Sequence, residues 1–400
     1  MRRALVACGA ALLAAPGAGA ESADLAQVER ARVLKAAEAY LGEAPVTITA
    51  SSSPRSAGGR HDYFSEADYW WPDPQSPGGP YVQRDGQSNP DNFDDHRRAM
   101  RRLSLQVPAL AAAYRLTGDA RYAVHAGSHL RAWFVDEATR MSPHLRYAQA
   151  IHGRVSGRGV GIIDTLHLVE VARAIESLAD APGLSPAERA AVRGWFGQYV
   201  EWMTTHEYGI AERDMRNNHA SCWVLQVAAF ARLAGRDDLV RFCRERFKGV
   251  LLPDQMAPDG SFPQETRRTK PYAYSLFNLE ALSGIAQLLS SPADDLWGFT
   301  LPDGRGLRRG LAFVEPFVRD RKGWPWPKDV MYDSAWPMRQ TSLLFGGLAL
   351  GEPGYLELWS ALPADSDVEE VVRNFFIRQP LLWVSPSAAV PSSARQRSGS

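Results

Sequence analysis

Apolar residues recur at helical spacing along most of this chain of 400 residues. The first such stretch runs from Leu25 to Leu41, with alanine, glutamate and arginine at the intervening positions. A connection rich in serine, proline and glycine follows over residues 43–62. Alternation of β-branched and polar residues is scarce, so few strands are expected. The pattern therefore predicts a mainly helical protein.

A series of helices is predicted from Phe93 onward. Asn92 or Asp91 stands where a side-chain oxygen can accept hydrogen bonds from the free N–H groups of the first helical turn. Two similar turns, Thr117-Gly118-Asp119 and Gly235-Arg236-Asp237, join neighbouring helices. The first predicted helix ends at residue 117 and the second at about residue 135. The next spans 219–233, and the helix after the second turn ends at about residue 248. The others span 272–289, 307–318, 336–350, 353–363 and 366–379.

The recurring unit is thus a pair of helices joined by a short turn. Each helix in such a series must bury an apolar stripe. Closure of the pairs into an (α/α) toroid achieves this and leaves a central cleft, and an open α-solenoid is the competing layout. We predict an all-α fold, an incomplete (α/α) toroid, in a single domain over residues 21–384. Residues 385–400, rich in serine, alanine, proline and arginine, are expected to form a flexible tail.

One long stretch, residues 61–96, interrupts the helical pattern. It contains the run Asp68-Tyr69-Trp70-Trp71-Pro72-Asp73-Pro74 and, further on, Arg84-Asp85-Gly86. Proline and glycine exclude a long regular element here. A loop of this length with so many aromatic residues is typical of a lid or binding loop. We expect Tyr69, Trp70, Trp71 and Arg84 to contact a ligand, unless the two tryptophans only pin the loop to the body.

Residues 1–20 have the pattern of a secretory signal peptide. Arg2-Arg3 form the charged start, residues 4–15 form an apolar run too short to span a bilayer, and Ala18-Gly19-Ala20 offers a cleavage site. We expect cleavage after Ala20 and a periplasmic or secreted mature protein.

Composition and charge narrow the possible partners. There are 45 acidic and 45 basic residues, so the chain has no global attraction to nucleic acid or to an anionic membrane. We therefore expect no nucleic-acid partner, no membrane association after signal removal, and a monomer. Outside the signal, Cys222 and Cys243 are expected to be small buried side chains, although the compartment permits a disulfide. No spacing typical of a structural zinc site is present.

A glycine-rich segment, residues 152–164, superficially suggests a phosphate-binding loop. No strand is predicted before it and the Gly-Lys-Ser/Thr ending is absent, so nucleotide binding is not expected. We expect instead a tight turn that presents Arg154 or Arg158 to the cleft, with a structural ion pair as the alternative for each arginine.

Two segments combine the groups needed to remove a proton from a carbon beside a carboxylate. Asn217-Asn218-His219 begins an apolar helix, and Arg267-Arg268 precedes a helix that carries Tyr272 and Tyr274. Amide and guanidinium donors neutralise a carboxylate, whereas imidazole and phenol transfer protons. In a uronic acid polymer these groups would permit β-elimination, because the C5 proton is acidic only when the C6 carboxylate is neutralised. An elaborate helix cap and a solvated basic face are the structural alternatives.

The motifs in these segments resemble known lyases. Asn217-Asn218-His219 with Trp223 resembles the Asn-Asn-His-Ser-Tyr-Trp motif of family 5 alginate lyases, and Pro263-x-Glu265-x-x-Arg268 resembles their Pro-x-Glu-x-x-Arg segment. Tyr274-x-x-Phe277 resembles the Tyr-x-x-Phe segment that follows it. The aromatic run of residues 68–74 and the segment 157–164 are similar to the alginate-lyase-domain proteins grouped with family 38, where glucuronan lyase activity is known. The resemblance spans most of residues 60–380.

The resemblance implies an (α/α) toroid that binds an acidic polysaccharide in its cleft and needs no metal or cofactor. Asn218 and Arg268 would neutralise the carboxylate, Tyr274 would be the general acid and also a candidate base, and His219 would be the base or its helper. Tyr272 lies close enough in sequence to compete with Tyr274. The predicted substrate-binding residues are Asn217, Tyr69, Trp70, Trp71, Arg84, Arg154, Arg158, Trp223, Arg267 and Tyr272.

Two other functions fit parts of the pattern. A glycoside hydrolase on the same toroid would need two carboxylates that flank the cleft, with Asp68, Asp73, Asp164 and Glu265 as candidates. A non-catalytic protein that binds acidic polysaccharides would use the aromatic loop as its sugar platform. Neither accounts for the combination of amide, imidazole, guanidinium and phenol as directly as a lyase does.

Overall fold

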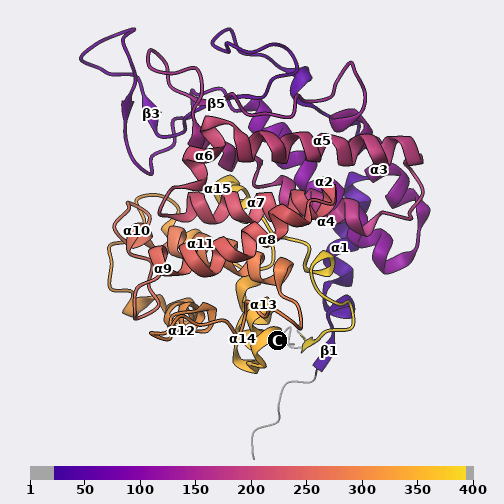
Figure 1. The fold of residues 1–400 in the computed structure, drawn as a ribbon, viewed down its shortest axis with the longest axis vertical. Helices are drawn as coiled ribbons and strands as arrows, with labels where there is room; N and C mark the ends of the chain where they lie inside the picture. Colours follow the sequence, from indigo (N-terminus) through magenta and orange to yellow (C-terminus); the bar gives the residue numbers. More distant parts are fainter. Residues whose placement is uncertain (1–21, 393–400) are drawn as a thin grey trace, which may run out of the picture.

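A computed structural model describes residues 22–392 of the chain, and its body is built from helices as predicted (Figure 1). The expected signal peptide lies outside the described residues. The helices are α1 Leu25–Tyr40, α2 Asp95–Thr117, α3 Ala120–Phe134, α4 Leu168–Ser177, α5 Pro186–Thr205, α6 Glu207–Arg213, α7 Asn218–Ala234, α8 Asp237–Arg246, α9 Leu252–Gln255, α10 Pro263–Thr266, α11 Pro271–Leu289, α12 Leu307–Arg319, α13 Thr341–Leu350, α14 Pro353–Ala361 and α15 Glu369–Asn374.

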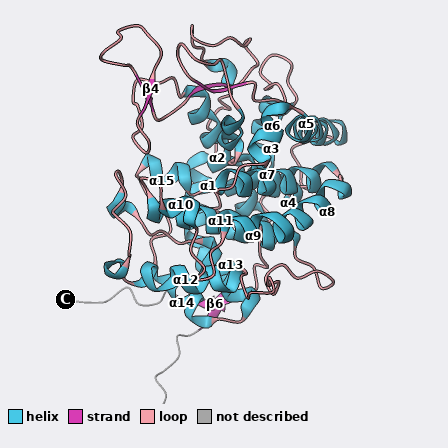
Figure 2. Ribbon diagram, turned by 60° about the vertical axis from the view of Figure 1, so that its left-hand side comes forward, coloured by secondary structure: helices cyan, strands magenta, loops and turns pink. Residues whose placement is uncertain are grey.

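Helix α7 lies in the core of this body. Almost every side chain from Asn218 to Leu233 is buried, because α7 packs against α4, α5, α8 and α11. Neighbouring helices also pair along the chain, α2 with α3, α7 with α8, and α13 with α14 (Figure 2). Gly118 and Gly235 end α2 and α7 with φ of 70° and 72°, a left-handed conformation that favours glycine, so both predicted turns are confirmed.

Strands are few and short among the described residues, which confirms the prediction. β2 Phe64–Glu66 pairs in parallel with β5 Tyr147–Ala150, and β3 Trp70–Trp71 pairs with β4 Val82–Gln83. The loops that carry these strands lie at one end of the helical body, with α12 and α14 at the other end (Figure 1).

Some predicted boundaries are wrong. Helix α2 begins at Asp95, after Asp94, so neither Asn92 nor Asp91 caps it as predicted. The side-chain amide of Asn92 donates instead to the carbonyl of Ala67. Helix α13 begins at Thr341 rather than 336, where the buried Glu280 carboxylate accepts hydrogen bonds from the first backbone N–H groups. Helix α15 is confined to Glu369–Asn374.

The two ends of the described chain meet. β1 Ser22–Asp24 pairs antiparallel with β6 Ala389–Pro391, and Leu25 N–H donates to the carbonyl of Ala388 at 2.9 Å. This ordered pairing differs from the flexible tail that the sequence predicted from residue 385, and residues 393–400 of that tail lie outside the described residues. Cys222 and Cys243 are buried free thiols, as expected. Within residues 22–392, no helix is long and apolar enough to cross a membrane.

Candidate active site

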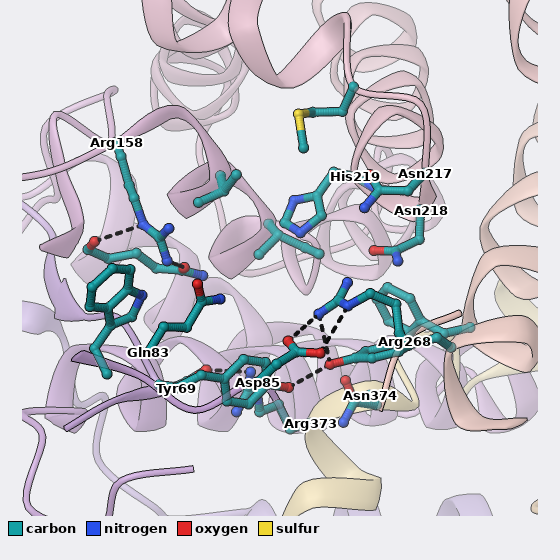
Figure 3. A pocket seen from close by; sticks show the side chains of 18 residues that line it. Tyr69, Gln83, Asp85, Arg158, Asn217, Asn218, His219, Arg268, Arg373 and Asn374 are labelled. Carbon is teal, nitrogen blue, oxygen red and sulfur yellow. Dashed lines mark hydrogen bonds and ion pairs between the residues drawn. The ribbon is translucent and has the colours of Figure 1, made fainter. Parts of the chain in front are cut away.

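A pocket of about 350 Å³ opens between the aromatic loop, the N-terminus of α7 and the start of α11 (Figure 3). It brings together side chains that lie more than 300 residues apart, from Asp68 to Asn374. Eight of the predicted site residues line it, namely Tyr69, Trp70, Arg158, Asn217, Asn218, His219, Arg268 and Tyr274.

The first turn of α7 presents Asn218 to the pocket in a fixed orientation. Asn217 caps the helix, because its side-chain oxygen accepts a hydrogen bond from His219 N–H at 3.3 Å. Asn218 donates from its backbone N–H and from Nδ2 to the two oxygens of the buried Glu265, at 2.7 and 2.6 Å. Burial raises the pKa of Glu265, and the hydrogen bonds from Asn218 oppose that rise. The two hydrogen bonds to Glu265 therefore fix the orientation of the Asn218 side-chain amide, which lines the pocket.

A second buried carboxylate, that of Glu212, contacts the imidazole of His219. Its Nδ1 lies 2.6 Å from Oε1 of Glu212, a residue of α6 whose side chain is 1% exposed. The imidazole itself is 18% exposed and lines the pocket. Because Nδ1 is engaged by Glu212, Nε2 is the ring nitrogen that remains for a ligand.

Tyr274 lies in the first turns of α11, with its hydroxyl in the pocket. The hydroxyl is 2.8 Å from that of Tyr69 and 3.4 Å from Nη2 of Arg268, whose guanidinium lies 4.5 Å from the tyrosine ring centre. Burial, followed by the neighbouring Tyr69, raises the pKa of Tyr274 well above its ordinary value, although Arg268 opposes the shift. Tyr274 is therefore protonated at neutral pH, as a general acid must be.

Arg268 forms a two-pronged ion pair with Asp85 of the aromatic loop. Nη2 and Nε donate to the two Asp85 oxygens at 2.7 and 3.2 Å, and Thr269 Oγ1 donates to the same carboxylate at 2.9 Å. Although burial acts to raise the pKa of Asp85, its hydrogen bond with Arg268 keeps that pKa low. Nη1 of Arg268 has no partner among the described residues, so this end of the guanidinium is free to bind a substrate carboxylate.

Two more guanidinium groups line the pocket. Arg158 lies across the pocket from Arg268 and donates to the carbonyl and the side-chain oxygen of Gln149, at 3.2 and 2.9 Å (Figure 3). Arg373 forms ion pairs with Asp68 and Glu370. Gln149 has φ of 51°, an uncommon conformation for a non-glycine residue that recurs at functional sites.

Six predicted contacts do not line the pocket, and three of them lie outside the aromatic loop and the glycine-rich segment. Tyr272 is fully buried and donates to the carbonyl of Phe317 at 3.2 Å, so it packs in the core. Trp223 is also buried, and its indole N–H donates to Met203 at 3.3 Å. Arg267 is exposed and donates to the carbonyl of Pro263 at 2.9 Å. Helical geometry explains the first two, since neighbouring positions on a helix face different directions.

The outer residues of the aromatic loop mainly bind one another. Arg84 lies 5.0 Å from the ring centre of Trp71, and Arg154 lies 5.2 Å from that of Trp70. Arg154 also donates to the carbonyl of Tyr81 at 2.8 Å. Trp71, Arg84 and Arg154 therefore stabilise the loop rather than line the pocket, whereas Trp70 does both.

The carboxylates proposed for a hydrolase are already engaged. Asp68 pairs with Arg97 and Arg373, and Asp164 accepts hydrogen bonds from Ser65 and Arg97 at 2.6 and 3.1 Å. Glu265 holds Asn218. Asp73 accepts a hydrogen bond from Gln75 N–H at 2.9 Å and does not line the pocket. The two carboxylates that line the pocket, Asp68 and Asp85, both form ion pairs with arginine, so the free acid and base of a glycosidase are not assembled there.

Sequence reasoning missed several residues of the site. Asp85 was visible in the Arg84-Asp85-Gly86 turn, but nothing in the sequence linked it to Arg268. Glu212 lies seven positions before His219, which would be two turns of one helix. However, α6 ends at Arg213 and α7 begins at Asn218, so helical spacing does not relate the two residues. The remaining missed residues that line the pocket are Gln83, Gln149, Val160, Ile163, Met215 and Phe277. Arg373 and Asn374, which the sequence left undecided between the cleft and a packed connection, line it as well.

Comparison with known proteins places this geometry in a family. The sequence matches the model of the family described as Alginate lyase over residues 47–324. An alginate lyase from Bacteroides ovatus is 29% identical, with 88% of this chain and 97% of that chain covered and a TM-score of 0.75. Among curated proteins, none matches this chain.

More distant solved structures share the fold. Two tetrasaccharide complexes of alginate lyase A1-III, one with a histidine replaced by alanine and one with a tyrosine replaced by phenylalanine, are each 16% identical to this chain. Each covers 91% of this chain, with 96% and 95% of their own chains covered and TM-scores of 0.54 and 0.55. These neighbours belong to the (α/α) toroid class, which confirms the predicted architecture.

Proposed function

This chain belongs to the alginate lyase family of polysaccharide lyases, and we propose that it cleaves a β-1,4-linked uronic acid polymer, glucuronan or alginate rich in mannuronate, by β-elimination. The product would carry an unsaturated uronate at its new non-reducing end. The observation that carries the proposal is the convergence of Arg268, Tyr274 and the Asn218-His219 pair on one pocket.

Each group has a task in the elimination. The free end of Arg268 and the amide of Asn218 would bind the C6 carboxylate and stabilise the negative charge that develops on it. As a base removes the C5 proton, the C–H electron pair forms the C4–C5 double bond and the C4–O4 bond breaks. The leaving O4 takes the Tyr274 hydroxyl proton, and the tyrosine later recovers a proton from solvent. No step requires a group outside the chain.

The identity of the base depends on ring stereochemistry. In glucuronate and mannuronate, the C5 hydrogen and O4 lie on the same face of the ring, so a single tyrosine can serve both steps. In guluronate they lie on opposite faces, and two separate groups are needed. Tyr274 and His219 are the two candidates that the pocket offers.

Ultraviolet absorbance of the unsaturated product tests the proposal. The mature protein is incubated separately with glucuronan, polymannuronate and polyguluronate, without added metal. We expect an increase with glucuronan or polymannuronate, and a loss of about a hundredfold or more in rate for Tyr274→Phe. New reducing ends without absorbance would support a hydrolase, and polymer binding without turnover would support a binding protein.

We also propose that residues 1–20 direct export to the periplasm or outside the cell, where such polymers occur. The charged start, the short apolar run and Ala18-Gly19-Ala20 support this assignment. Mass spectrometry of the protein recovered from an exporting host would show a mature N-terminus at Glu21, whereas an intact Met1 in the exported protein would contradict cleavage.

A further inference from the structure

Glu212 is a buried carboxylate that the proposed function leaves without a task. It lies near the end of α6, 1% exposed, with Oε1 at 2.6 Å from Nδ1 of His219. Its Oε2 has no hydrogen-bond partner among the described residues. Burial of a carboxylate is costly unless it is compensated, and the imidazole N–H is the contact that compensates it here. The pair is therefore more than incidental packing.

The contact determines which nitrogen of His219 carries hydrogen. An ionised Glu212 can only accept, so Nδ1 must donate to it. In the neutral imidazole the proton then resides on Nδ1, and the lone pair of Nε2 is directed to the pocket. A ring without this partner would exchange its proton between the two nitrogens and rotate about its side-chain bonds.

The electrostatic surroundings of the pair come from several elements. The Glu265 carboxylate on α10 interacts with both Arg268 and His219. Burial lowers the pKa of Arg158, and the carboxylates of Asp164 and Glu212 oppose that shift. The buried Cys222 thiol on α7 also lies near Glu212. Tyr274, which keeps its proton, lines the same pocket and supplies the acid.

From this geometry we propose that Glu212 is a positioning residue that fixes His219 with Nε2 bare and facing the substrate, so that His219 is the base that removes the C5 proton. The inference rests on the proposed function, because it assigns the base of that elimination. The proton moves from C5 to Nε2, Glu212 stabilises the imidazolium that forms, and Tyr274 remains the separate acid.

Nuclear magnetic resonance tests the hold of Glu212 on the ring directly. In protein labelled with ¹⁵N-histidine, two-bond correlations distinguish the Nδ1–H from the Nε2–H form, and His219→Gln identifies the signals of this ring. We expect the Nδ1–H form in the wild type and a mixture of both forms in Glu212→Ala. A predominant Nε2–H form in the wild type, or an unchanged spectrum in Glu212→Ala, would overturn the positioning role.

The pH profile of kcat/KM separates a base from a cationic clamp. A base acts when neutral, so activity rises with pH through the histidine pKa. Glu212→Gln keeps an acceptor oxygen but removes the charge that favours the imidazolium, so the acidic limb should move to lower pH by about one unit while kcat falls about a hundredfold and KM changes little. Glu212→Asp, which keeps the charge, should leave the limb in place.

Glu170→Gln provides the matched control. Glu170 is also fully buried, but it accepts hydrogen bonds from the backbone of Arg378 and Gln379, outside the pocket. The Glu170→Gln variant should leave the acidic limb of the pH profile unchanged. An activity that falls as pH rises, with an alkaline limb that moves in Glu212→Gln, would identify His219 as a clamp and overturn the base assignment. Absence of turnover on any uronan would overturn the proposed function and the base role together, whereas the positioning role is still decided by the spectrum.

Discussion

Two tyrosines two positions apart have opposite surroundings in this protein. The Tyr274 hydroxyl contacts Tyr69 and Arg268 in the pocket, whereas that of Tyr272 bonds to a backbone carbonyl in the core. Arg321 also lies 3.8 Å from the ring centre of Tyr272. The sequence left both as candidates for the acid, and the direction in which each side chain leaves α11 separates them.

The corresponding phenylalanine variants should therefore differ in kind. Tyr272→Phe removes one buried hydrogen bond, so we expect the free energy of unfolding to fall by about 1 kcal/mol with turnover retained. Tyr274→Phe should lose turnover with little change in stability. Urea denaturation and the absorbance assay measure the two effects, and a loss of activity in Tyr272→Phe at full stability would contradict this assignment.

Arg158 is expected to contribute to substrate binding rather than to the chemical step. It forms no ion pair with a described carboxylate, and it faces Arg268 across the pocket (Figure 3). A neighbouring uronate of the polymer could neutralise it in both the ground state and the transition state. We expect Arg158→Gln to raise KM about tenfold with kcat nearly unchanged, since loss of uniform binding affects KM alone.

Arg268→Gln is the comparison for that variant. Because Arg268 stabilises charge that develops during proton removal, its loss should lower kcat by about a hundredfold. Equal kcat effects in the two variants would show that Arg158 also acts on the transition state.

At the residue scale, the sequence identified the groups that form contiguous motifs. Asn218, His219 and Arg268 were found because their motifs are short and chemically distinctive. Asp85, Gln149 and Arg373 were not, because their positions in the pocket depend on tertiary contacts between segments that the sequence gives no reason to join.

At the element scale, the aromatic loop of residues 61–96 packs closely against Thr269 at Gly86. Gly86 has φ of 74°, and a Cβ there would lie 2.4 Å from Thr269 Oγ1. Gly78 in the same loop has φ of 77°, but a Cβ there would meet nothing within 4 Å. The two glycines share a backbone conformation and differ in the space around them.

This difference gives a matched pair of variants. Both Gly86→Ala and Gly78→Ala should lose about 1 kcal/mol of stability from the left-handed conformation. Only Gly86→Ala should displace Asp85 from Arg268 and Thr269, and we expect its kcat/KM to fall about tenfold while that of Gly78→Ala stays near wild type. Similar kcat/KM values in the steady-state assay would mean that the loop does not position Arg268.

Helix α13 carries a pH-dependent cap. Burial raises the pKa of Glu280 to about 7, although the N–H groups of Thr341 and Ser342 favour its ionised form. The folded pKa lies above the unfolded value of 4.5, so this group contributes most stability below pH 4.5 and loses it as pH rises toward 7. The change amounts to about 3 kcal/mol at most.

Unfolding measurements on Glu280→Gln test that sign. Relative to wild type, the variant should gain stability between pH 5 and pH 8 in urea denaturation. Glu357→Gln, at an exposed position of α14, should differ from wild type by a constant amount over the same range. A constant difference for Glu280→Gln as well would contradict a raised pKa.

Element boundaries show what local sequence can and cannot reveal. Helix α5 begins with a complete capping box, in which Ser185 and Glu188 bond to each other's backbone N–H, and this signal was available in the sequence but was not used. The start of α13 was not available, because its cap is Glu280 from another helix, 61 positions away.

At the scale of the whole molecule, the balanced composition conceals a local asymmetry. The net charge is zero, yet three arginines line one pocket. Composition excluded a global attraction to polyanions, but a local concentration of guanidinium groups is produced only by the fold. The same holds for the chain ends, which the sequence places 369 positions apart from Ser22 to Pro391 and the structure pairs.

That pairing predicts how the ends affect stability. We propose that residues 21–384 form a single domain and that β6 fastens its ends together. Val390 is 1% exposed, so a chain that ends at residue 384 loses its burial as well as the β1–β6 hydrogen bonds. Burial of one such side chain contributes about 2 kcal/mol, which for a chain of this length should lower Tm by about 2–3 °C.

A chain that ends at residue 392 keeps β6 and serves as the control, with Tm expected to match the full-length protein. Because β1 and β6 do not line the pocket, the shorter chain should keep its kcat/KM at temperatures well below its Tm. Equal Tm values for the two truncations would show that the pairing adds little stability. A loss of kcat/KM in the fully folded shorter chain would instead connect the chain ends to the active site.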